Sequence, residues 1–235
     1  MGKAQPIMPS LLTTNSKLAQ SRDHGHLSAG LEFLPGNKSG AEMCPHRAAC
    51  FATCIDGAGF GKMPTTVRAR LRRARHYIED PTDFLAILSA EITIHAATAK
   101  RLALVPTVRL NVFSDLPWEE IAQNLFPRFP AVQFLDYTKS PDRARAALRP
   151  EWPSNYHLLY SWNEKATHQF GTAHLRAGGN IAAVTREHGT DLPTWMQKAP
   201  QVDGDAHDLI HLHAPGSILQ LTPKANLKHN RTQFA

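Results

Sequence analysis

The sequence predicts an α/β fold whose mainly parallel sheet is open or curled into a partial, irregular (β/α) barrel, preceded by an N-terminal helical segment that carries cysteines. Short apolar runs follow residue 104, and helical patterns separate them. Strands that alternate with helices indicate βαβ crossovers, which join parallel strands. With 235 residues and a hydrophobic share of 42%, the whole chain, 1–235, is expected to form a single domain.

The first 63 residues are expected to hold little regular structure. Residues 1–30 are rich in Ser, Thr, Asn, Gly and Pro, which predicts an irregular N-terminal arm. Residues 30–34 alternate like a short strand that stops at Pro35. Residues 41–63 carry the cysteines and are the expected metal-binding segment, in which Pro45 favours a short helix over residues 46–54.

Residues 64–103 predict two helices, over about 65–78 and 81–102. In the second, Phe84, Leu88 and Ile92 recur at helical spacing and mark the apolar side. The βα repeats follow over residues 104–235. Their expected strands are 107–113, 132–137, 156–162, 180–185 and 217–221, and their expected helices are 118–125, 142–148 and 164–176.

Composition and charge bound the classes of function. No apolar stretch approaches the roughly 18 residues of a membrane helix, and residues 1–15 lack the pattern of a signal peptide. We therefore expect a cytoplasmic protein without a membrane partner. The formal net charge of +6 favours polyanions, so nucleic acid, in particular DNA, is the expected partner. The alternative is that the basic residues only solvate the surface.

Three cysteines lie within eleven residues, with the spacing Cys44-x5-Cys50-x3-Cys54. Clustered thiols in odd number, in a reducing compartment, indicate metal binding or redox chemistry. Zinc would require a fourth ligand, whereas a four-iron cluster with three protein ligands keeps one iron open for a small molecule. The alternative is that the thiols are small buried apolar side chains. The candidates for a fourth ligand are His46, His76 and Asp56.

Several short motifs, spread over most of the chain, occur in an order typical of one protein family. They include Asn15-Ser16-Lys17-Leu18, Cys44-Pro45, Arg109-Leu110-Asn111, Ser114-Asp115-Leu116-Pro117-Trp118-Glu119, Asp136-Tyr137-Thr138-Lys139, Asn155-Tyr156-His157-Leu158 and Asp203-Gly204-Asp205. In these motifs the chain resembles the gene-product-88-like family of bacteriophage proteins. The resemblance implies a phage-encoded α/β protein of barrel-like type, with a link to phage deazaguanine DNA transglycosylases. The related tRNA enzymes carry zinc cysteines late in the chain, so that site does not transfer to these early cysteines.

Polar residues follow the expected strands, where ligands bind in parallel α/β folds. We expect Asp136, Asp115 and Lys139 to be catalytic, because base exchange needs one carboxylate at the sugar carbon and a second acid for proton transfer. Either aspartate can hold either role. The alternative makes Asp115 a helix N-cap and Asp136 with Lys139 a surface ion pair. The residues expected to bind substrate are Arg109, Asn111, Ser161 and Glu164.

Arginines at 68, 72 and 75 form one stripe on the first of the two long helices. Arg68, Arg72 and Arg75 are therefore expected to bind nucleic acid phosphates, the alternative being a solvated helix face.

Three functions compete at this point. The leading hypothesis is a nucleic-acid-modifying enzyme that exchanges bases in DNA, with an aspartate nucleophile and a bound metal or iron–sulfur site. The second is a radical enzyme that uses S-adenosylmethionine and an iron–sulfur cluster, although its usual spacing Cys-x3-Cys-x2-Cys is not present. The third is a module without chemistry that binds nucleic acid or a phage partner and holds a structural metal.

Overall fold

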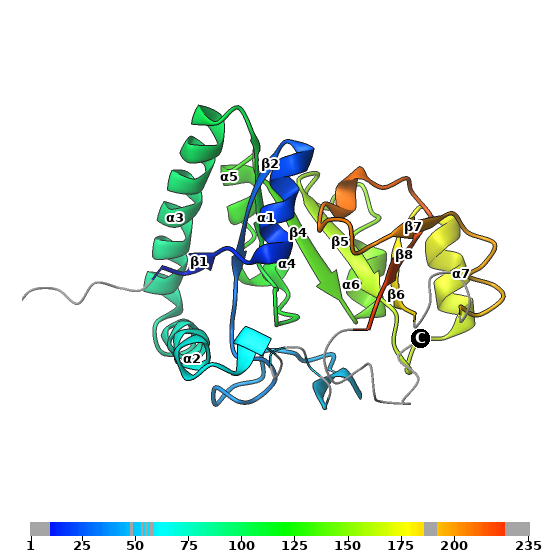
Figure 1. Cartoon of the computed structure of the whole chain (residues 1–235), viewed down its shortest axis with the longest axis horizontal. Coiled ribbons are helices and arrows are strands. Elements are labelled where there is room, and N and C mark those ends of the chain that lie inside the picture. The colour runs from blue at the N-terminus through cyan, green and yellow to red at the C-terminus, as the bar shows by residue number, and fades with distance from the viewer. Residues whose placement is uncertain are drawn as a thin grey trace, which may run out of the picture.

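The protein is built on one eight-stranded sheet with helices on its flanks (Figure 1). The computed structural model describes residues 10–47, 49–52, 54, 56, 59–185 and 192–223. The strands lie in the order β1-β2-β3-β4-β5-β6-β8-β7. Only β1 is antiparallel to its neighbour, and every other pair is parallel. The predicted α/β fold with a mainly parallel sheet is confirmed.

Six parallel strands follow one another in space in the order of the chain. They are β2 (His26–Leu31), β3 (Val105–Arg109), β4 (Gln133–Thr138), β5 (Tyr156–Ser161), β6 (Ile181–Val184) and β8 (Ile218–Leu221). The edge strands are β1 (Leu12–Thr13) and β7 (Gln201–Asp203). Consecutive order is the winding of a (β/α) barrel, whereas a doubly wound sheet reverses its order part-way. All six carboxyl ends therefore meet at one edge of the sheet.

Local sequence signals account for the helix starts. Proline occupies the first turn of α2, α3 and α6, where its missing N–H costs no hydrogen bond. Asp80, Ser140 and Thr167 cap α3, α6 and α7 through their side-chain oxygens. The helices are α1 (Ser16–Gln20), α2 (Pro64–Glu79), α3 (Pro81–Arg101), α4 (Trp118–Ile121), α5 (Leu125–Arg128), α6 (Pro141–Ala146) and α7 (His168–Arg176), with 3-10 turns at Ser21–His24, Ala49–Phe51, Gly59–Lys62 and Ile210–Leu212.

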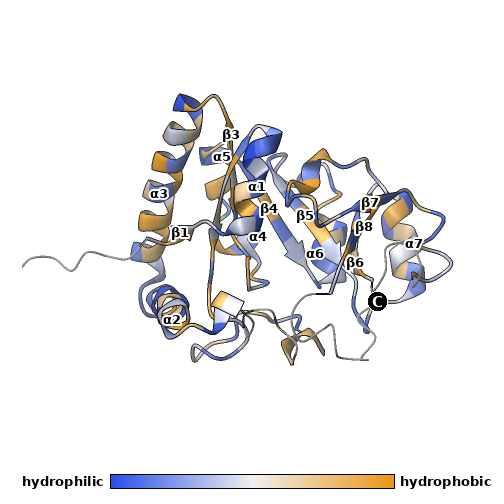
Figure 2. Cartoon of the chain, in the orientation of Figure 1, coloured by the Kyte–Doolittle hydropathy of each residue, from blue (hydrophilic) through white to orange (hydrophobic). Residues whose placement is uncertain are grey.

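The two faces of the sheet carry different cores. On one face, β4 and β5 pack Phe134 and Tyr156 against Trp118 and Phe126 of the short helices. On the other face, Leu135 and Leu159 pack beneath the 3-10 turn Ile210–Leu212. Helix α3 adds its own buried stripe, Phe84, Leu88 and Ile92, and Figure 2 shows apolar residues interleaved with hydrophilic ones along it. Alternation along a strand thus decides which layer each side chain enters.

The predicted irregular arm is wrong for residues 10–30; residues 1–9 lie outside the described part of the chain. This segment contains β1, α1 and β2. Asn15 caps α1 by accepting hydrogen bonds from Lys17 N and Leu18 N, and the Glu91 carboxylate accepts from Leu11 N and Leu12 N. Although residues 10–31 are mostly polar, three of their leucines are buried, Leu11, Leu18 and Leu31.

The predicted helix over residues 46–54 is also wrong. In the described part of that stretch the only helical element is the 3-10 turn Ala49–Phe51, and Cys54 lies after it. Helix 118–125 is instead two single turns, α4 and α5, and the edge strand β7 was not predicted.

Candidate functional site

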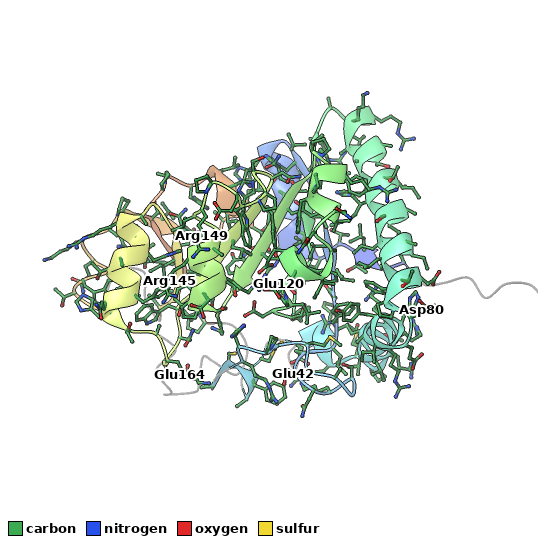
Figure 3. The ribbon with its side chains drawn as sticks, turned by 180° about the vertical axis from the view of Figure 1, so that it is seen from behind. Glu42, Asp80, Glu120, Arg145, Arg149 and Glu164 are labelled. Carbon is green, nitrogen blue, oxygen red and sulfur yellow. The ribbon has the colours of Figure 1, made fainter. Side chains whose placement is uncertain are left out.

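The cysteine-bearing segment, residues 32–62, crosses the carboxyl edge of the parallel sheet. Backbone and side-chain contacts of its described residues tie it to the ends of two strands. Asp115 N donates to Met43 O over 2.9 Å, and the Cys44 thiol donates to Phe113 O over 3.3 Å, both after β3. Ala49 N donates to Glu164 Oε1 over 2.7 Å, after β5. Figure 3 shows Glu42 and Glu164 at this same end of the molecule.

The three cysteines are half-buried and free of disulfides. Burial raises the pKa of Cys44 to about 11, and the charges of Asp115 and Cys50 add to the increase. Burial raises the pKa of Cys54 to about 12, with contributions from Asp56 and Cys44. Cys44 therefore interacts with both other thiols. Among the described residues, however, no three His, Cys, Asp or Glu side chains are grouped closely enough to hold one metal ion.

Lys139 lies at the centre of this edge, directly after β4. Its amine donates to Ser161 Oγ over 3.1 Å, and its backbone N donates to Asp115 Oδ2 over 2.9 Å. Burial lowers the pKa of Lys139, whereas electrostatic interactions with Cys50, Asp115 and Glu164 act to raise it. The structure thus brings together four predicted site residues, Lys139, Asp115, Ser161 and Glu164, beside a cysteine.

Asp115 is held in a buried ion-pair network. The Arg143 guanidinium donates to Asp115 Oδ1, and it binds both carboxylate oxygens of Glu119 over 2.6 and 2.8 Å. It also donates to the Tyr156 hydroxyl over 3.2 Å. The N-cap of α4 is Pro117, so Asp115 does not cap that helix. Because it binds both Arg143 and the Lys139 backbone, the Asp115 carboxylate holds together the chain segments that follow β3 and β4.

Asp136 and Asn111 are enclosed on the helix-covered face, beneath the Asp115 and Arg143 ion pair. The Asp136 side chain has no exposed surface. It accepts hydrogen bonds from Asn111 N, from Asn111 Nδ2 and from the Tyr156 hydroxyl over 2.6, 3.1 and 2.9 Å. Burial raises its pKa to about 7, although Asn111 and nearby arginines act to lower the pKa. Neither residue is placed where a substrate at the strand ends can touch it.

Arg109 is part of a third group, on the opposite face of the sheet. It donates to Asp208 Oδ2 over 2.7 Å, and its guanidinium lies 4.4 Å from the Tyr137 ring centroid. Lys17 adds a second ion pair to Asp208 at 2.9 Å. Burial would raise the pKa of Asp208, but these two cations lower it to about 2. Arg109 is thus committed to a buried ion pair with Asp208, which was not predicted because the two residues are remote in the sequence.

The arginines of α2 divide by burial. Arg68, Arg72 and Arg75 are exposed and form the predicted stripe. Arg70 pairs with Glu32 over 3.0 Å and lies 3.9 Å from the Phe113 ring centroid, and Arg73 donates to Ser10 O. Two of the five arginines therefore support the fold, and three remain for an anionic partner.

A comparison with protein families supplies the identity of the chain. Residues 9–235 match the family described as Gene product 88. The chain belongs to this phage gene-product family. The resemblance inferred from the motifs is confirmed, and the link to deazaguanine transglycosylases stays a prediction. No curated protein and no solved structure matches the chain. No helix in the described ranges is long and apolar enough to cross a membrane.

Histidines gather at the other edge of the sheet, near the amino ends of β2 and β5. The ring centroids are 4.4 to 5.2 Å apart in each of four pairs. Burial, with the charges of His157 and His26, lowers the pKa of His211 to about 4. No motif spacing signals this group, because its members come from three segments of the chain. The histidine cluster consists of His24, His26, His157, His207, His211 and His213.

A change of Asp136 to Ala tests its place in the fold. The variant leaves the Asn111 amide and the Tyr156 hydroxyl without an acceptor, so we expect a loss of about 2–4 kcal/mol in the free energy of unfolding, measured in urea. Asp142→Ala, at an exposed position, is the control and should cost less than about 0.5 kcal/mol. An Asp136 variant of unchanged stability would restore this residue as a candidate nucleophile.

The histidine cluster predicts that acid destabilises the fold. Because folding lowers the pKa of His211 from 6.5 to about 4, the unfolded chain binds more protons below pH 6.5. Stability attributable to this ring therefore falls as the pH drops from 7.5 to 5. We expect His211→Gln to be relatively more stable at pH 5 than at pH 7.5 by about 1 kcal/mol, a value reduced for solvent screening. The exposed His168→Gln should show no such difference, and a pH-independent effect of His211→Gln would contradict the assignment.

Proposed function

We propose that the protein is an iron–sulfur enzyme of the radical type that uses S-adenosylmethionine, with Cys44, Cys50 and Cys54 as cluster ligands. The observation that supports this most directly is the position of the cysteine-bearing segment. It follows β2, the first strand of the consecutive parallel series, and crosses the edge where Lys139, Ser161 and Glu164 gather. In barrels of this winding, chemistry takes place at the carboxyl edge.

A four-iron cluster requires a wider arrangement of thiols than a single zinc ion does. Ligands of one zinc ion must approach a common point, and no three described donors do so. The three ligands of a four-iron cluster bind three different irons, so their sulfurs stand further apart. When bound, such a cluster supplies single electrons to a small molecule at its open iron.

The neighbouring side chains match the polar groups of S-adenosylmethionine, whose amino acid part carries a carboxylate and an ammonium group. The Lys139 amine is a half-buried cation suited to a carboxylate. Glu164 is an exposed anion suited to an ammonium group, and the Ser161 hydroxyl can hold either partner by a hydrogen bond. We therefore assign these residues to binding and orientation of the small molecule.

The unusual spacing of the cysteines follows from the local backbone. Cys50 lies in a 3-10 turn and Cys54 lies after it, so no helical period fixes the interval between them. The position of this segment depends on its anchors at Met43 and Ala49 rather than on a fixed count of residues. A departure from Cys-x3-Cys-x2-Cys is compatible with the same chemistry.

A nucleic acid substrate is the second part of this proposal. The exposed stripe Arg68, Arg72 and Arg75 lies on α2, which begins directly after the cysteine-bearing segment. It offers three cations to phosphates beside the candidate site. We do not propose base exchange with Asp136 as nucleophile, because that carboxylate is enclosed beneath the helices.

Metal analysis of protein purified without oxygen tests the proposal. We expect a brown protein with about four iron and four sulfide per chain, and loss of both in Cys44→Ser. Asp56→Asn is the matched control, since Asp56 interacts with Cys54 and is one of the candidates for a fourth zinc ligand. It should retain the iron. A colourless protein that binds one zinc ion, and loses it in Asp56→Asn, would contradict the proposal.

A further inference from the structure

A cavity of about 720 Å³ lies beside α7, away from the cysteine-bearing segment. Its wall is formed by one side of this helix, by residues 194–199 and by Gly216. The volume falls within the roughly 300–1,000 Å³ range of sites for small organic ligands. It shares no lining residue with the candidate iron–sulfur site, so the inference does not rest on the proposed function.

An indole is fixed in the wall of this cavity. Trp195 is half-buried, and its ring centroid lies 5.0 Å from the Trp162 ring and 5.0 Å from the His168 ring. The glycine at position 171 makes this possible, because a Cβ there would lie 2.2 Å from the Trp195 ring. The sequence thus places a large flat ring, held by its neighbours, at the border between core and cavity. Rings in this position stack on nucleic acid bases.

The charge of the lining has one sign. Arg176 and Lys198 are exposed cations, His168 can add a third, and none of the described residues that line the cavity is acidic. No carboxylate pairs with Arg176 or Lys198 in the ranges the structure describes. Two cations without a partner at one cavity favour a ligand that carries negative charge.

We propose that this cavity binds a nucleoside phosphate. Trp195 stacks on the base, and Arg176 and Lys198 bind the phosphate. Such a phosphate can belong to a free nucleotide or to the 5′ end of a single strand, and both present the same chemistry to these side chains.

Calorimetric titration of the full chain tests the proposal. The probes are adenosine monophosphate, adenosine, and a single-stranded DNA octamer with and without a 5′-phosphate. We expect the monophosphate to bind at least about tenfold more tightly than adenosine, and Arg176→Glu and Trp195→Ala each to weaken it at least about tenfold. Arg101→Glu is the matched control, because Arg101 is likewise the exposed last residue of a helix, and it should not change binding.

The octamers separate the two sources of the phosphate. Tighter binding of the phosphorylated octamer than of adenosine monophosphate identifies a strand end, and the reverse identifies a free nucleotide. Equal binding of adenosine and its monophosphate, an equal loss in Arg101→Glu and Arg176→Glu, or no binding of any probe at millimolar concentration would overturn the proposal.

Discussion

The buried guanidinium of Arg143 is the contact on which the geometry of the carboxyl edge depends. It joins α6 to Glu119 on α4, to Tyr156 on β5 and to Asp115 after β3. Asp115 in turn binds the backbone of Lys139 through its side chain and that of Met43 through its own N–H. Because removal of one partner from a buried ion pair leaves an uncompensated charge, this chain of contacts resists local change. The positions of Lys139 and of Cys44 both follow from it.

The alternation of side chains along β4 separates structure from chemistry. Phe134 and Asp136 enter the helix-covered layer, whereas Leu135 and Tyr137 enter the opposite one. Asp136 therefore stabilises the fold through its hydrogen bonds with Asn111 and Tyr156. Lys139 lies just beyond the strand, and its amine binds Ser161 at the carboxyl edge of the sheet. Proximity in sequence between Asp136 and Lys139 does not make them one site.

Much of the fold is predictable from local patterns. Helix α3 follows from Phe84, Leu88 and Ile92 with Pro81 at its start, and the consecutive strands follow from short apolar runs. The structured segment at 10–31 was missed because its polar residues are caps and its few leucines show no period. The ion pairs of Arg143 and Asp208 were not predicted because their partners lie 28 and 99 residues away, respectively, and no local pattern records such distances. The cysteine spacing indicated a shared site, but only the fold places it over the strand ends.

We propose that the three thiolates at this edge hold a four-iron cluster with one open iron. The electron paramagnetic resonance spectrum of anoxically reconstituted, dithionite-reduced protein tests this proposal most directly. We expect a four-iron cluster signal that changes when S-adenosylmethionine is added, because the small molecule would bind the open iron. A signal indifferent to S-adenosylmethionine, or a reconstituted protein without iron, would contradict it.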